Sequence, residues 1–272
     1  MASSPPNSVD ALLALLPPYT NKYPYRSLLN FRSILSYEAK RLHEESKSSQ
    51  FVLFTHLTPV TFDSDFEQPT RDIICHAIDS YSPKQEELVL KMKTGSHEAA
   101  HKAFDKLLNE KLAFMNLADR KLLGVGSKTV HATSRSKEAD QAYRPLNLPS
   151  GRTVDWPTFA MESGYTESAE TLRNNAIWWL AASAGDVKIV VTIDINKRSR
   201  QVSFTKHDRL NDDGSIHEQL VTVTAAGVSG SPMVLAFDRL LLTHPTAAES
   251  DIEFTRADFE YMAESIWREQ FR

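Results

Sequence analysis

The chain has 272 residues, of which 41% are hydrophobic and 24% are charged. This length is enough for one large domain, or for one domain with an added subdomain, and it allows a sizeable buried core. The formal net charge of -4 argues against a protein that coats nucleic acid, because phosphate binding needs a basic face. A local basic groove is still compatible with this charge.

Cysteine usage and hydropathy indicate the compartment. The single cysteine, Cys75, allows no disulfide within the chain, which fits a reducing environment. The first 20 residues lack a cationic leader and contain only the short apolar run LLALL, and no other apolar run is long enough to cross a bilayer. We therefore expect an intracellular protein, cytoplasmic or nuclear, without a membrane partner.

The N-terminal third predicts an accessory layer that carries no chemical motif. Residues 26–48 have apolar side chains at helical spacing and predict a long amphipathic helix. Residues 51–62 are enriched in Val, Phe and Thr and predict a strand. We expect residues 1–95 to form an N-terminal helical layer and residues 96–272 to form the core with C-terminal strands and a helix, the two making one compact unit.

The middle of the chain predicts the order helix, strand, strand, strand, helix, strand. The expected elements are a helix over 96–115, strands over 124–133, 136–143 and 157–162, a helix over 166–183 and a strand over 187–195. Ser96 is a suitable N-cap for the first helix, and Thr255 for a last helix that ends near Phe271. Further short strands are expected over 201–207, 220–224 and 233–237, before this last helix. The order predicts a mixed α/β fold and not the strict alternation of a doubly wound sheet.

Two carboxylates fall at the ends of predicted strands. Alternation along residues 157–162 places Thr158, Ala160 and Glu162 on one face, so that small side chains leave room beside Glu162. Asp140 lies on the extended segment just before this strand. Two carboxylates that converge at strand ends form a hard-oxygen site suited to Mg²⁺ or Mn²⁺. Such an ion polarises a phosphoryl group and activates water.

This order of elements, with Asp on the second strand and Glu on the third, resembles the PD-(D/E)XK nuclease-like superfamily. The segments SRSKEADQAYRP and PTFAMESGYTESAETLRNNAIWWLAASAGDVKIVV look more narrowly like a fungal branch of it, over residues 97–196. The resemblance implies a restriction-endonuclease-like core and divalent-metal-dependent phosphodiester hydrolysis. It also implies that Asp140 and Glu162 are the acidic residues of the second and third strands.

The sequence departs from the family pattern at two positions. Ala139 stands where the family name implies proline, and Gly164 stands where the motif lysine would follow Glu162. Since that lysine normally positions or activates the attacking water, its absence argues against a typical nuclease. Arg173 on the following helix and Lys137 near the acidic residue are the candidate replacements. Arginine keeps its proton, so it can clamp a phosphate but cannot act as a base.

Each candidate residue also has a purely structural interpretation. Glu162 could cap the following helix, and Asp140 could be a residue at the surface end of a strand. Arg173 could form a surface salt bridge; in the functional interpretation, Glu170 three residues before it could hold it in place. One of the two adjacent tryptophans on this helix is expected in the core.

A second motif lies in the first predicted helix. The run from His97 to His101 matches HExxH, the pattern of zinc metallopeptidases, with both histidines on one helical face. A peptidase is disfavoured because Lys102 directly follows the motif and no third ligand stands at a familiar spacing. In the nuclease-like interpretation, Glu98 or Glu110 is a candidate outer carboxylate near the metal.

Three hypotheses for function remain open. The first is a phosphodiester hydrolase that acts on nucleic acid, with Mg²⁺ or Mn²⁺ held by Asp140 and Glu162 and with help from Lys137 or Arg173. The second is a repurposed fungal enzyme of small-molecule biosynthesis, a cyclase or an isomerase, that uses the same acidic site on a small-molecule substrate. The third is a binding protein that keeps the fold without catalysis or metal. The first is our main expectation, because the resemblance gives it a defined mechanism.

Overall fold

The computed structural model describes residues 16–17, 19–45, 48–67, 78–126, 129–133, 135–165, 169–209 and 215–271. The described chain forms two compact units, one made from residues between 1 and 92 together with 131–138, the other from 93–130 and 139–272. Cys75 and the first residues of the helix expected over 166–183 lie outside the described residues. Within the described ranges, no helix combines the length and the apolar character needed to cross a membrane.

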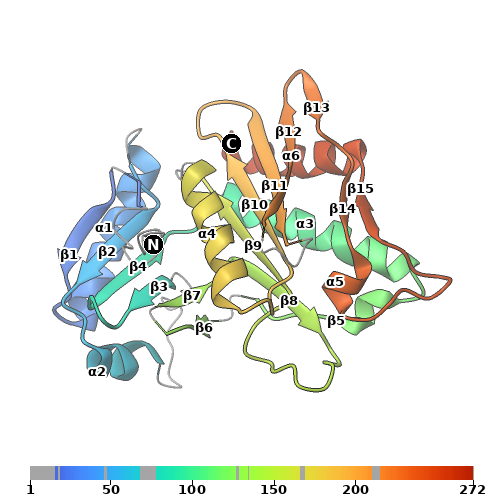
Figure 1. The fold of residues 1–272 in the computed structure, drawn as a ribbon. Coiled ribbons are helices and arrows are strands. Elements are labelled where there is room, and N and C mark those ends of the chain that lie inside the picture. The colour runs from blue at the N-terminus through green and yellow to red at the C-terminus, as the bar shows by residue number, and fades with distance from the viewer. Residues whose placement is uncertain are drawn as a thin grey trace, which may run out of the picture. The chain divides into compact units, whose positions relative to one another are not determined.

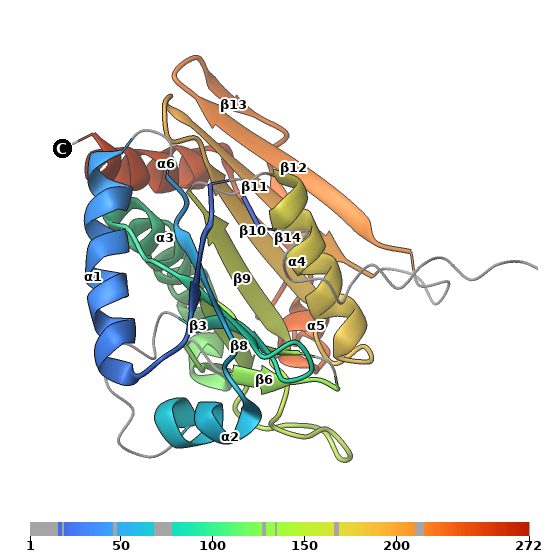
Figure 2. The ribbon, with the colours of Figure 1, turned by 90° about the vertical axis from the view of Figure 1, so that its left-hand side faces the viewer.

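The first unit is built on a six-stranded mixed sheet in the order β1-β2-β4-β3-β7-β6. The strands are β1 (Asn21–Pro24), β2 (Phe51–Thr55), β3 (Ile78–Ser82), β4 (Glu87–Lys91), β6 (Thr129–His131) and β7 (Ser136–Glu138). Strand β1 runs parallel to β2, whereas β2, β4, β3 and β7 pair antiparallel in turn. Helix α1 (Leu28–Glu44) packs on this sheet (Figure 2) and is followed after β2 by the short α2 (Pro59–Phe62) and a π-helical turn.

Apolar side chains bury both faces of this sheet. On the side of α1, the ring of Phe31 lies 4.8 Å from that of Phe54 and 5.1 Å from that of Phe66. On the other side, Phe51 and Leu53 belong to a second apolar cluster. Because strands buried on both faces lack a polar alternation, their sequence resembles that of a buried helix segment. This explains why the N-terminal part contains more strands than the helical layer that the sequence suggested.

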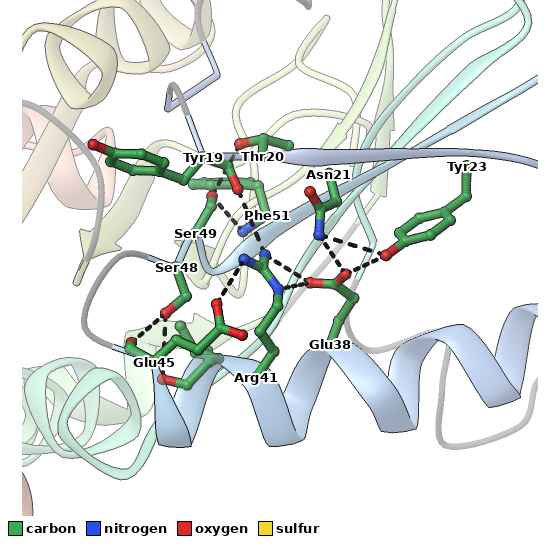
Figure 3. Close-up of polar contacts among 11 residues, drawn as sticks. Tyr19, Thr20, Asn21, Tyr23, Glu38, Arg41, Glu45, Ser48, Ser49 and Phe51 are labelled. Atoms are coloured by element: carbon green, nitrogen blue, oxygen red, sulfur yellow. Dashed lines mark hydrogen bonds and ion pairs between the residues drawn. The ribbon is translucent and has the colours of Figure 1, made fainter.

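A buried carboxylate ties α1 to β1 (Figure 3). Glu38 is fully buried, and its Oε1 accepts hydrogen bonds from the Tyr23 hydroxyl at 2.5 Å and from Asn21 Nδ2 at 2.8 Å. Arg41 Nε donates to Oε2 at 2.8 Å. Burial, together with the neighbouring Glu38, raises the pKa of Tyr23 to about 12. The phenol therefore stays protonated and acts as a donor at every physiological pH.

The second unit is built on a seven-stranded sheet in the order β13-β12-β11-β10-β9-β8-β5. The strands are β5 (Leu122–Gly124), β8 (Gln141–Pro145), β9 (Phe159–Gly164), β10 (Ile189–Ile195), β11 (Gln201–Asp208), β12 (His217–Thr224) and β13 (Gly227–Ser229). Only the central pair β9 and β10 is parallel among the described pairings of this sheet. Before the last helix, β14 (Met233–Leu235) pairs antiparallel with β15 (Ile252–Phe254). The connection between these two strands contains α5 (Phe237–Leu241).

Helices cover both faces of this sheet (Figure 1). Helices α3 (Gly95–Phe114) and α6 (Arg256–Gln270) lie on one face, and α4 (Ala169–Ala182) lies on the other. The α3–α6 face holds the main apolar core, to which β9 contributes Phe159 and Met161. The side chains that alternate with them on β9 point toward α4. The face under α4 is therefore the one that receives Glu162.

The expected order of helix, strands, helix and strand is found as α3, then β5 to β9, then α4 and β10, which confirms the mixed α/β fold. The strand expected over 124–133 is not one strand, because Gly124 ends β5 whereas Thr129–His131 form β6 in the other sheet. Helix α3 starts one residue earlier than expected, because Thr94 and not Ser96 is its N-cap, with its hydroxyl accepting from the His97 amide at 3.2 Å. The segment 136–143 is not one strand. A break that includes Asp140 divides it into β7 and β8, which belong to different sheets.

Glu249 anchors the loop after α5. Its Oε1 lies 2.5 Å from Lys121 Nζ, and its Oε2 accepts from the Thr246 amide at 2.9 Å. These contacts lower the pKa of Glu249 from 4.5 to about 2.

We expect an NMR titration to report a pKa of about 2 for Glu249 in the wild type and a pKa nearer 4.5 in Lys121→Met. Since the folded-state pKa is the lower one, the stabilisation by Glu249 is complete above pH 4.5 and is lost as the pH falls to about 2. A pKa of Glu249 that stays near 2 in Lys121→Met would show that Lys121 is not the cause.

Candidate functional site

Glu162 lies on β9, an inner strand of the seven-stranded sheet, and is fully buried. Its Oε1 accepts a hydrogen bond of 2.7 Å from Nε1 of Trp179, which is also fully buried and lies well inside α4. A buried carboxylate requires such donors, because the loss of water otherwise disfavours its charge. This contact fixes the direction of the carboxylate under α4.

Asp140 is placed against the neighbouring strand. It directly precedes β8, and its amide donates to the Met161 carbonyl at 3.1 Å. Its Oδ2 accepts from the Ser163 amide at 2.7 Å and the Ser163 hydroxyl at 3.2 Å, and it lies 2.9 Å from Nε2 of His97. Asp140 is 7% exposed. The carboxylate is thus anchored by the amide of the residue that follows Glu162.

The structure brings the two predicted carboxylates to the same end of adjacent strands. Asp140 contacts the side chains of Ser163 and His97, whereas Glu162 contacts Trp179. Because consecutive residues of a strand point to opposite faces, these contacts lie on the α3 side and the α4 side of the sheet, respectively. Joint binding of one ion by both carboxylates stays a prediction.

A second group of metal-binding side chain types lies at the start of α3. His97, Glu98 and His101 each offer a ligand atom, and these atoms lie within 4.8 Å of one another. Glu98 Oε1 is 3.4 Å from His101 Nε2 and 3.9 Å from His97 Nδ1. The two histidines are 0% and 8% exposed. Their spacing of four residues puts both on one face of the helix, as the sequence indicated.

The charges in this group are set by burial and by its neighbours. Burial, and next the adjacent His97, lower the pKa of His101, so that its imidazole is neutral at neutral pH. Burial alone would raise the pKa of Glu98, but His101 and Lys93 outweigh it and the pKa falls. A neutral imidazole and an ionised carboxylate are the forms that bind a metal ion.

Lys137 lies on β7 in the first unit and is fully buried. Its Nζ donates to Asp79 Oδ1 at 2.8 Å, and Arg135 Nη2 lies 3.4 Å from Oδ2 of the same carboxylate. Burial acts to raise the pKa of Asp79, but Lys137 and Arg135 outweigh it and lower the pKa overall. The described contact of Lys137 is therefore structural, and its catalytic role stays a prediction.

Arg173 lies on α4 with a side chain that is 52% exposed. Its Nε donates to Glu218 Oε1 on β12 at 2.6 Å, so its described partner is Glu218 and not Glu170. This contact agrees with the salt-bridge interpretation of Arg173. Its binding to a phosphate stays a prediction, because a half-exposed guanidinium can also reach a ligand.

The sequence reasoning missed a polar network on the sheet face under α4. Thr192 on β10 pairs in register with Glu162, and its hydroxyl lies 3.1 Å from His207 Nε2 on β11. His207 Nδ1 lies 3.3 Å from Glu218 Oε1. Burial lowers the pKa of His207 and raises that of Asp194, two residues after Thr192. The available signal was the pair Thr192 and Asp194, which stand two residues apart in the otherwise apolar β10.

Comparison with known proteins adds little to this geometry. No family model and no curated protein matches the sequence. Among solved structures, the chain is similar to a candidate nuclease of the family DUF820 from Anabaena variabilis, with 12% sequence identity and a TM-score of 0.41. The match covers 68% of this chain and 90% of the other.

Proposed function

We propose that the chain is a divalent-metal-dependent hydrolase of phosphodiester bonds, with Asp140 and Glu162 as ligands of Mg²⁺ or Mn²⁺. The observation that supports the proposal is the hydrogen bond from the Ser163 amide to Asp140, which ties this buried carboxylate to the residue next to the buried Glu162. A shared ion requires one of the two side chains to turn, because their described contacts lie on opposite faces of the sheet. Carboxylate oxygens are the ligands that these hard ions prefer. The resemblance of the sequence to PD-(D/E)XK nucleases supplies the expected bond type.

The surrounding residues have distinct roles in this proposal. The ion would polarise the phosphoryl group and lower the pKa of a bound water. Asp140 is held by Ser163 so that its geometry does not depend on the ion, and Glu162 is oriented by Trp179. His97, whose Nε2 lies 2.9 Å from Asp140 Oδ2, is a candidate proton acceptor beside this carboxylate. Arg173 is a candidate clamp for a phosphate but not a base.

The test combines calorimetry with a cleavage assay. Mg²⁺ and Mn²⁺ are titrated into the wild type, Asp140→Asn, Glu162→Gln and the control Glu253→Gln, which replaces an exposed carboxylate on β15. We expect the wild type and the control to bind metal and to cleave DNA or RNA oligonucleotides. The cleavage rate of each of the two site variants should fall by about 100-fold or more. Replacing a residue that only hydrogen-bonds to a metal ligand can already lower activity by up to about 100-fold.

Two results would contradict the hydrolase. One is a wild type that binds neither Mg²⁺ nor Mn²⁺, and the other is cleavage that persists in a chelator or in both site variants. Folding of each variant is verified by circular dichroism, because both carboxylates are buried. Metal binding without cleavage of any nucleic acid would leave the metal site standing and reject the phosphodiester substrate.

One observation favours a second candidate, a small-molecule enzyme that uses the same acidic site. Trp179, which bonds to Glu162, belongs to a cluster of three tryptophans, with the ring of Trp178 5.3 Å from that of Trp179 and 5.8 Å from that of Trp156. Aromatic rings next to a buried acid are suited to bind and to protonate an apolar substrate. This candidate predicts binding of small apolar ligands, measured as quenching of tryptophan fluorescence, that Glu162→Gln weakens.

A further inference from the structure

The proposed hydrolase mechanism does not use three side chains at the start of α3 as metal ligands. His97, Glu98 and His101 lie on one turn of the helix, and both imidazoles are buried. Three of their ring nitrogens make no hydrogen bond of good geometry with another described residue: Nδ1 and Nε2 of His97, and Nε2 of His101. Buried ring nitrogens that approach a carboxylate without bonding to it are unusual, because buried polar groups are nearly always satisfied.

The separations within this group approach those of ligands around one ion. Zinc binds nitrogen and oxygen ligands at about 2.0–2.1 Å, so two ligands of a tetrahedral ion are about 3.3 Å apart. Glu98 Oε1 stands 3.4 Å from His101 Nε2 and 3.9 Å from His97 Nδ1. All three ligand atoms lie within 4.8 Å of one another, so the side chains must draw closer together to reach ligand geometry.

The other nitrogen of His97 lies beside a carboxylate, as is usual for a histidine that binds a metal. A histidine that binds a metal through one nitrogen usually donates the other N–H to a carboxylate, which fixes the ring and its tautomer. His97 Nε2 lies 2.9 Å from Asp140 Oδ2, and Asp140 is itself held by Ser163. This leaves Nδ1 directed toward Glu98. The arrangement differs from the HExxH peptidases, in which the glutamate is the general base.

From these contacts we infer that His97 Nδ1, Glu98 Oε1 and His101 Nε2 bind a transition-metal ion, with Asp140 as the partner that positions His97. Two imidazoles and one carboxylate select Zn²⁺, Co²⁺ or Mn²⁺ over Mg²⁺, which prefers oxygen ligands and retains its water. The site goes beyond the proposed hydrolase, because it stands whether or not the chain cleaves phosphodiesters. It shares only Asp140 with the Asp140–Glu162 pair.

The alternative for Glu98 is a role as the centre of a surface salt-bridge cluster. Lys93 Nζ lies 3.8 Å from Oε1 and Lys102 Nζ lies 3.4 Å from Oε2. Lys102 is 72% exposed, so its side chain can turn to solvent. An exposed pair of this kind contributes little, so the main competitor of a metal ion for Oε1 is the Lys93 ammonium, whose side chain is 26% exposed. Binding experiments separate the two roles, because the salt-bridge cluster needs neither histidine.

The experiment follows Co²⁺ binding to the chelator-treated full chain by visible absorption, with Zn²⁺ and Mg²⁺ as competitors. The variants are His97→Gln, His101→Gln and Glu98→Gln, with His217→Gln as the control because it replaces an exposed histidine on β12. We expect the wild type and the control to bind one Co²⁺ with the absorption bands of a site of low coordination number. Each of the three site variants should bind at least about tenfold more weakly. Zn²⁺ should displace Co²⁺ and Mg²⁺ should not.

Three outcomes would overturn the inference. They are no Co²⁺ binding by the wild type, unchanged affinity in both histidine variants, and displacement by Mg²⁺ at the same concentrations as by Zn²⁺. Glu162→Gln separates this site from the hydrolase, because it should keep Co²⁺ binding while it loses any cleavage. If Glu162→Gln loses Co²⁺ binding as fully as His101→Gln, the ion lies on the Asp140–Glu162 pair and the histidine site is rejected.

Discussion

Replacing Trp179 with alanine is expected to lower the free energy of unfolding by about 3–5 kcal/mol, the usual range for a buried tryptophan. Trp179 is fully buried under α4, and its ring lies 5.3 Å from that of Trp178 and 6.0 Å from that of Trp156. Truncation opens a large void between α4 and the sheet and removes the N–H that orients Glu162. Urea denaturation followed by circular dichroism measures the loss.

Trp179→Phe separates the packing role from the hydrogen bond. Phenylalanine fills most of the volume but offers no donor to Glu162, so we expect a smaller loss of about 1–3 kcal/mol. If Glu162 acts in catalysis, this variant should also reduce activity at a temperature where it is fully folded. A stability of Trp179→Ala within the error of the wild type would contradict the buried position of Trp179, and equal losses in both variants would assign the effect to the hydrogen bond.

Replacing Lys137 with methionine is expected to lower the free energy of unfolding by about 3 kcal/mol, because it removes one partner of a buried ion pair. Methionine keeps much of the length of the side chain but removes the ammonium that lies 2.8 Å from Asp79. Asp79 then keeps the hydroxyl of Ser80 at 2.8 Å and the guanidinium of Arg135 at 3.4 Å. The control is Lys84→Met, which replaces an exposed lysine of the same unit and should change little.

The pH dependence of this loss tests its electrostatic origin. The folded-state pKa of Asp79 is below its ordinary value, so its stabilisation is complete above the unfolded-state pKa of about 3.9 and is lost as the pH falls through the folded-state value. The difference between the wild type and Lys137→Met should therefore be full at neutral pH and shrink below about pH 4. A variant with normal stability but no activity would instead assign Lys137 to catalysis.

The outline of the core could be predicted from the sequence because it depends on local patterns. Helical spacing predicted α3 and α4, and alternation predicted β9 with Glu162 on the face opposite Met161. The threonine that caps α6 was also predictable, since Thr255 forms a capping box with Asp258. The N-terminal sheet was harder to predict, because its strands are short and buried on both faces and so show no clear period.

The partners of the candidate site residues were decided by the tertiary structure alone. Sequence spacing placed His97 and His101 on one helical face, but Asp140 lies beside His97 only because α3 packs against the sheet. In the same way, the pairing of β10, β11 and β12 brings His207 and Glu218 together, and Arg173 finds Glu218 from another element. Local sequence determines which face a side chain lies on, because that follows from the geometry of one helix or strand. Its partner depends on the order in which distant strands pair, which no local pattern encodes.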